Sequence, residues 1–336
     1  MRPGAASPPP GRGSGTAEET AGGEVRTPPP YSVSFELDTP SPFRLDLTAW
    51  ALRRRPENAV DRWDGTSYRR VMAIGGGATE VSVSQDGPMP AGRLSVGLSG
   101  RPLGTSESTG VRTSLRRLLG LDVDLAAFHR RARRDPRIGL LVKRFLGFTP
   151  PRFSSLFECL VNAFACQQLS LLVGIRLLNR LAQAYGPALP HGDSRVYGFP
   201  LPEALAKAEP EELRSLGFSH QKAAAIVELS RAVAAGALDL EELEHVPNEE
   251  VTRRLRTLRG VGRWSSGYAL LRGLGRMDVF PWGDAGARNG LGRWLGIERR
   301  LTYEEAQALV EPWRAFGGLL YFHLLLAKLS EQGYVT

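Results

Sequence analysis

The sequence has only two cysteines, Cys159 and Cys166, in 336 residues. Two thiols cannot supply the four ligands of an iron–sulfur cluster or of an all-cysteine zinc site. They also do not form a CxxC pair, so we expect two buried thiols in the core of an intracellular protein. The sequence therefore predicts neither an iron–sulfur cluster nor a disulfide framework.

Long apolar runs are missing as well. No 18-residue apolar stretch is present that could span a bilayer, and the N-terminus lacks the apolar segment of a secretion signal. We therefore expect a cytoplasmic protein with no membrane partner.

Lysine is scarce, whereas positive charge is not. Only Lys143, Lys207, Lys222 and Lys328 occur among 43 basic residues, so arginine supplies nearly all of the positive charge. The formal net charge is +8. Such a balance suits a polyanion, because cationic side chains that neutralise phosphates release condensed counterions. The charge alone is equally consistent with a protein that is merely basic.

The chain divides into three regions by composition. Residues 1–30 are rich in Pro, Gly, Ser and Ala, which predicts a disordered tail. Residues 31–120 contain short alternating runs broken by Gly and Pro, with two helix-like stretches, and predict a small α+β domain with an antiparallel sheet. Residues 121–330 predict an all-helical domain without a convincing strand, in which Ser155 and Ser170 are expected to cap helices and Gly186 to end one. The fold class is therefore mainly α with an α+β N-terminal domain.

Residues 255–275 predict two helices joined by a tight turn at Gly260-Val261-Gly262. Two glycines one residue apart permit positive φ and a close approach of the backbone to a ligand. The second helix begins with free N–H groups, and these donors and the helix dipole suit a DNA phosphate. Taken on its own, this segment is better explained by an ordinary turn between two helices.

Asp284 follows that hairpin in the segment MDVFPWGDAGARN. Pro281 and Gly283 break the preceding helix, so Asp284 is expected near the start of the next one. A carboxylate there can cap the helix, and this role alone would account for it.

Several segments together carry a resemblance to a known family. The segment GVGRWSSGYALLRGLGRMDVFPWGD is similar to the helix–hairpin–helix, loop and Asp signature of a DNA glycosylase superfamily. FECLVNAFACQQLSLLVGIRLLNRL resembles the first core helices of its 3-methyladenine DNA glycosylase II (AlkA-like) branch, and EPWRAFGGLLYFHLL resembles a later one. The resemblance covers roughly residues 31 to 330. It implies a helix–hairpin–helix glycosylase fold preceded by a small antiparallel-sheet domain.

The resemblance implies roles for individual residues. Asp284 matches the catalytic carboxylate, and Gln168 matches the residue inserted into DNA where the base leaves. The positions that grip phosphate are Gly260, Gly262, Arg263 and Trp264. The positions that line the base pocket are Trp264, Tyr268, Trp282 and Phe322. The backbone carbonyls that hold a structural Na⁺ or K⁺ are those of Arg256, Leu258 and Val261. Phe322 stands where the family has Trp, and Arg259 stands where it has Pro.

The resemblance implies a monomeric base excision repair enzyme of the bacterial nucleoid that acts on double-stranded DNA with damaged bases. Such an enzyme flips the nucleotide out of the stack and stabilises an oxocarbenium-like sugar with its carboxylate. An aromatic pocket would attract cationic bases such as 3-methyladenine and 7-methylguanine. Relatives with lyase activity carry a Lys where this chain has Trp264, which predicts hydrolysis alone. The alternatives are a glycosylase for oxidised or deaminated purines and a non-enzymatic DNA-binding protein.

Overall fold

The computed structural model describes residues 33–85, 87, 92–100 and 103–336. The predicted tail over 1–30 lies outside these residues. No helix in the described ranges is both long and apolar enough to cross a bilayer. In chain order the elements are β1 (Val33–Asp38), α1 (Leu45–Arg53), β2 (Arg62–Trp63), β3 (Ser67–Ile74), β4 (Gly77–Gln85), β5 (Arg93–Gly100), α2 (Thr105–Leu119), α3 (Ala126–Ala132), α4 (Pro136–Arg144), α5 (Leu156–Cys166), α6 (Leu171–Tyr185), β6 (Ala188–His191), β7 (Ser194–Tyr197), α7 (Pro202–Leu205), α8 (Pro210–Ser215), α9 (His220–Ala234), η1 (Glu241–His245), α10 (Asn248–Leu255), α11 (Arg263–Tyr268), η2 (Ala269–Gly273), α12 (Ala285–Trp294), α13 (Tyr303–Val310), η3 (Glu311–Phe316) and α14 (Gly317–Glu331).

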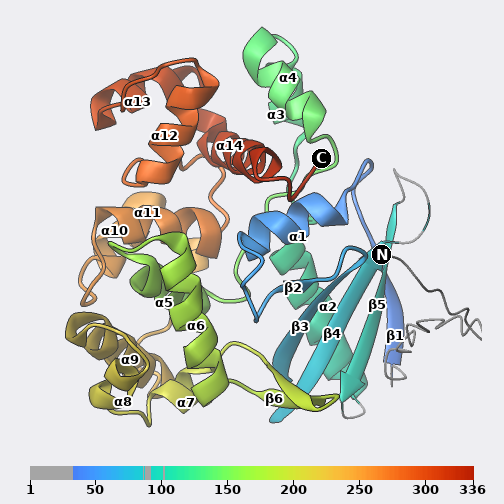
Figure 1. The fold of residues 1–336 in the computed structure, drawn as a ribbon, viewed down its shortest axis with the longest axis vertical. Coiled ribbons are helices and arrows are strands. Elements are labelled where there is room, and N and C mark those ends of the chain that lie inside the picture. The colour runs from blue at the N-terminus through green and yellow to red at the C-terminus, as the bar shows by residue number, and fades with distance from the viewer. Residues whose placement is uncertain (1–32, 86, 88–91, 101–102) are drawn as a thin grey trace, which may run out of the picture. The chain divides into compact units, whose positions relative to one another are not determined.

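The predicted fold class is confirmed. Five antiparallel strands form one sheet in the order β1-β5-β4-β3-β2, and helices follow it along the chain (Figure 1). Alternating side chains of the strands and the apolar face of α2 fill a common core, as the period-2 pattern requires. The expectation that no strand follows residue 121 was wrong, because β6 and β7 pair as a short hairpin.

Helix α1 is buried on two sides and joins the sheet to the helical part of the molecule. Leu45, Ala49 and Leu52 belong to the core under the sheet. Leu47, Trp50 and Ala51 belong to a second core built mainly from α3, α4, α12 and α14. The helix ends at Arg54, whose backbone is left-handed at φ 64° and which is only 7% exposed. The two-sided burial of α1 therefore carries this arginine into the interior of the protein.

The ends of α5 and α6 follow the expected capping chemistry. The Ser155 and Ser170 side chains accept hydrogen bonds from the backbone N–H groups of Glu158 and Val173. Gly186 ends α6 as predicted, but with an extended backbone at φ −80°. Glycine is needed there because a Cβ would lie 2.1 Å from the carbonyl oxygen of Gly198. A close approach of two chain segments, not a left-handed turn, therefore explains this glycine.

Candidate active site

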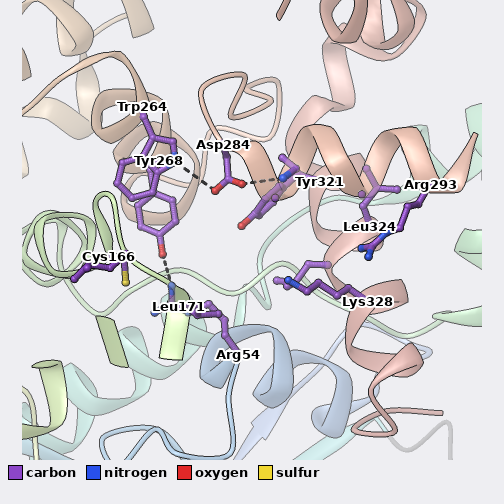
Figure 2. Close-up of a pocket in the computed structure, with 15 residues that line it drawn as sticks. Arg54, Cys166, Leu171, Trp264, Tyr268, Asp284, Arg293, Tyr321, Leu324 and Lys328 are labelled. Carbon is purple, nitrogen blue, oxygen red and sulfur yellow. Dashed lines mark hydrogen bonds between the residues drawn. The ribbon is translucent and has the colours of Figure 1, made fainter. Parts of the chain in front are cut away.

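A cavity of about 280 Å³ opens where α1, the α5–α6 junction, α11, α12 and α14 meet (Figure 2). Its volume is close to the lower end of small-molecule sites, about 300 Å³. The lining residues combine aromatic rings, aliphatic side chains, one carboxylate and three cations. They are Arg54, Cys166, Leu169, Leu171, Trp264, Tyr268, Asp284, Gly286, Ala287, Gly290, Arg293, Tyr321, Leu324, Leu325 and Lys328.

Asp284 is half-buried in the wall of this cavity and is the N-cap of α12. One carboxylate oxygen accepts the Ala287 N–H at 2.8 Å, and the other accepts the indole N–H of Trp264 at 3.3 Å. Gly283 allows this pairing, because a Cβ there would lie 3.0 Å from Cα and Cβ of Trp264. The capping role expected from the sequence is therefore real, and it fixes the carboxylate at the cavity wall.

Trp264 and Tyr268 form one aromatic wall of the cavity. They lie four residues apart on α11, and their rings stack with centroids 5.4 Å apart and an interplanar angle of 22°. Tyr321 of α14 adds a third ring. Burial and the negative charge of Asp284 raise the pKa of the Tyr321 hydroxyl to about 12, so it is a neutral hydrogen-bonding group at physiological pH.

Two of the predicted pocket residues do not line this cavity. The side chain of Phe322 is fully buried against Phe148 and Tyr321 in the core. Successive residues of a helix point about 100° apart, so the neighbouring Tyr321 faces the cavity and Phe322 faces away. Trp282 packs against Phe280 and Tyr303 in the same core.

The hairpin turn lies between α10 and α11. Gly260 has a left-handed backbone at φ 79°, and an added Cβ would crowd Ala225 and Phe164. Gly262 has φ −107°, and apart from its chain neighbours no heavy atom of the described residues lies within 4 Å of the position of a Cβ there. The first glycine is therefore required by the turn, whereas the second keeps space open at the start of α11.

No side chain of the described residues caps the start of α11, so its first N–H groups remain available to an anion. Helix α11 continues without a break into the π-helical segment η2, so the two helical segments together span residues 263–273. Gln167 fixes the turn from the other side, because its side-chain amide donates to the carbonyl of Gly260 at 2.8 Å and to the Ser265 hydroxyl at 2.7 Å.

Gln168 occupies the exposed junction between α5 and α6. Its φ of 55° is left-handed, a conformation that costs energy for a residue with a side chain. The adjacent Leu169 is 43% exposed and lines the cavity. The strained junction therefore holds a polar and an apolar side chain beside the cavity.

Three cationic residues of the cavity were missed in the sequence. Arg54 comes from the sheet region, Arg293 from α12 and Lys328 from α14. Arg54 lies more than 200 residues before the hairpin, and no local pattern connects the two. Lys328 is one of only four lysines in the sequence, which could have drawn attention to it. The prediction about lysine considered only the start of the second hairpin helix, where this chain has Trp264.

Comparisons with known proteins find similarity over both the sheet region and the helical region of this chain. Residues 34–155 match the model of the AlkA N-terminal domain, and residues 161–315 match that of the HhH-GPD superfamily base excision DNA repair protein. A Bacillus subtilis protein named DNA-3-methyladenine glycosylase is 24% identical over 86% of this chain and 95% of its own length. Another Bacillus subtilis protein, which is named putative DNA-3-methyladenine glycosylase YfjP, is 31% identical over 53% of this chain. The match spans 60% of the length of YfjP.

A solved structure gives the same result in three dimensions. The 3-methyladenine DNA glycosylase from Archaeoglobus fulgidus superposes with a TM-score of 0.75 at 26% sequence identity. The match covers 87% of this chain and 97% of that protein. The sheet and the helical part thus occur together in a protein of known structure.

Proposed function

Since this chain belongs to the HhH-GPD superfamily of base excision DNA repair proteins and carries an AlkA N-terminal domain, we propose that it is a glycosylase that hydrolyses the N-glycosidic bond of alkylated bases in duplex DNA. The observation that carries the proposal is the position of Asp284. Its carboxylate lies beside the Trp264–Tyr268 stack in a cavity that adjoins the hairpin.

The chemistry follows from these groups. A base flipped out of the duplex packs against the aromatic wall, which brings the sugar C1′ toward Asp284. When the bond from C1′ to the base breaks, positive charge develops on the sugar and the carboxylate stabilises it. Water adds to C1′ and gives up a proton, which the carboxylate accepts. Base release from methylated duplex DNA, with the products resolved by chromatography, tests this proposal.

The hairpin supplies the grip on DNA. We expect Gly262→Val to weaken binding to duplex DNA about tenfold, because the side chain would fill the open space where a phosphate meets the first N–H groups of α11. The loss should be the same for all sequences, since a phosphate contact reads no base. Fluorescence anisotropy across a salt series measures it.

Gly110→Ala is the matched control for Gly262→Val. Gly110 lies on α2 with nothing within 4 Å of its Cβ position, so the variant should bind DNA as the wild type does. Unchanged binding by Gly262→Val would remove the hairpin from the DNA interface.

We propose that Gln168 enters the duplex at the position the flipped nucleotide leaves. Its exposure and strained backbone support this role. Gln168→Ala should therefore reduce excision several-fold while affinity for DNA with an abasic site falls less, because an abasic nucleotide has no base to unstack. Equal losses on both measurements would leave Gln168 with a purely structural role at the helix junction.

We propose that the reaction is hydrolysis without a lyase step. Support comes from the family resemblance, which matches Trp264 to the position at which lyases carry the lysine nucleophile. Lys328 lines the cavity, however, so the amine has to be tested directly. Borohydride added during the reaction should give no covalent protein–DNA adduct. An adduct that disappears in Lys328→Arg would contradict the proposal.

We also propose that the hairpin holds Na⁺ or K⁺ through the carbonyls of Arg256, Leu258 and Val261. The Leu258 carbonyl accepts the Val261 N–H at 3.2 Å, and within the described part of the chain no hydrogen bond reaches the other two carbonyl oxygens. Neutral oxygens of this kind suit a hard monovalent cation. Such an ion would add positive charge where the turn meets a phosphate.

A further inference from the structure

Arg54 places a buried cation in the wall of the candidate base cavity. Figure 2 shows its side chain extending from the end of α1 to the hydroxyl of Tyr268. One terminal nitrogen donates to that hydroxyl at 2.8 Å, and the other donates to the side-chain oxygen of Asn162 at 3.0 Å. Both partners are neutral, and the buried Nε has no hydrogen-bond partner. Within the described ranges, no carboxylate forms an ion pair with Arg54.

A buried charge without a counter-ion is costly, so its presence at a ligand cavity calls for a functional explanation. Another buried arginine shows the contrast. Arg70 is 2% exposed and pairs with Asp61 at 2.8 Å and Glu158 at 2.6 Å. The interior of this protein does contain acidic partners for arginine, but among the described residues none of them forms an ion pair with Arg54, and Asp61 acts on it only from beyond ion-pair distance.

The other charged groups that line the cavity do not neutralise the positive charge of Arg54. Arg293 and Lys328 add two cations, and Asp284 is the single carboxylate among the lining residues. Arg293 lies 4.0 Å from Glu331, at the limit of an ion pair, and both side chains are more than half exposed. The wall of the cavity is therefore net positive, and Arg54, its most buried charged group, forms no ion pair with any described residue.

The positive charge of the cavity wall should act differently on cationic and on neutral bases. A base alkylated at a ring nitrogen enters the cavity as a cation and leaves as a neutral molecule. A neutral base leaves with both electrons of the broken bond and is negatively charged until it is protonated. The water that adds to C1′ supplies that proton by way of Asp284. A nearby guanidinium repels the first kind of substrate and stabilises the second as it leaves.

We propose that Arg54 is a specificity-determining residue that favours excision of neutral bases, such as deaminated or oxidised purines, over cationic alkylated bases. The inference rests on the proposed glycosylase function and concerns how Arg54 divides that activity between cationic alkylated bases and neutral ones. It reverses the preference expected from the aromatic rings alone, because a fixed cation in a buried wall acts more strongly on charge than the face of a ring does.

The test compares two lesions that share a carbonyl oxygen at C6 and differ in charge. Single-turnover excision is measured on duplexes with one hypoxanthine, which is neutral, or one 7-methylguanine, which is cationic. We expect Arg54→Gln to lower the ratio of the hypoxanthine rate to the 7-methylguanine rate by about tenfold or more. Arg54→Lys keeps the charge and should retain most of the wild-type ratio.

Asn162→Asp provides an independent variant that keeps Arg54. The new carboxylate would lie where the amide oxygen now accepts from the guanidinium, so it would neutralise the charge in place. It gives up one hydrogen bond to the Glu158 carbonyl, and thermal unfolding shows whether the fold is kept. The ratio should fall as in Arg54→Gln. Arg93→Gln alters an exposed arginine and is the control with an unchanged ratio.

Three outcomes are distinguishable. A ratio that falls in Arg54→Gln and Asn162→Asp and is retained in Arg54→Lys supports the inference. Rates that fall equally on both lesions, or a ratio that stays constant while folded protein excises, overturn it and leave Arg54 as a support for Tyr268. If the wild-type protein releases neither base, the proposed function itself fails.

Discussion

Asp284→Asn is expected to slow base release by about 10²–10³-fold, the loss typical of deleting one electrostatic stabiliser. The substitution keeps the shape of the side chain and removes its charge. An Asn oxygen can still accept the Ala287 N–H, so α12 keeps its cap. The amide cannot stabilise positive charge on the sugar, and its NH₂ group would face the indole N–H of Trp264, which now donates to a carboxylate oxygen.

A second capping aspartate separates the chemical role of Asp284 from its structural one. Asp135 caps α4 by accepting the N–H groups of Arg137 and Ile138, and it does not line the cavity. Asp135→Asn should therefore excise at the wild-type rate. Single-turnover kinetics at saturating enzyme measure both variants. A wild-type rate for Asp284→Asn would return this residue to a capping role alone.

Arg70→Met should lower the free energy of unfolding by about 3–5 kcal/mol, because it leaves two buried carboxylates without their cation. Arg70 of β3 joins Asp61 to Glu158 of α5, and all three side chains are almost completely buried. The hydroxyl of Tyr68 also donates to Asp61 at 2.7 Å. This ionic cluster connects the sheet to the first core helix and so supports the frame around the cavity.

An exposed ion pair gives the comparison for Arg70. Arg93 and Glu36 lie 3.0 Å apart, with side chains 68% and 61% exposed. Arg93→Met should change the free energy of unfolding by no more than about 1 kcal/mol, because solvent screens such pairs. Urea unfolding followed by circular dichroism measures both variants. Equal losses would mean that the buried cluster contributes no more than a surface pair.

Local patterns were enough to predict much of this fold. Alternation of apolar residues within residues 31–120 predicted the antiparallel sheet, and Ser155 and Ser170 marked helix starts correctly. The hairpin of β6 and β7 was missed because each strand has four residues and β6 contains Pro190, which weakens any strand signal.

Some residues of the candidate site were likewise predictable from a local segment, whereas others depend on tertiary packing. Trp264, Tyr268 and Asp284 lie within one local segment, and the resemblance identified them together. The choice between Tyr321 and Phe322 depends on the rotation of α14 about its own axis, which packing sets and sequence similarity resolves poorly. Arg54 reaches the cavity only because α1 is buried between two cores. A tertiary arrangement of that kind has no local sequence signature.

The proposed hydrolysis of a glycosidic bond in DNA can be followed in one reaction. Free base and strand breakage are measured together, with methylated duplex DNA and the protein of residues 1–336. Hydrolysis without a lyase step predicts that free methylated bases accumulate while the strands stay intact until alkali cleaves the abasic sites. Base release no faster than in protein-free DNA would contradict it.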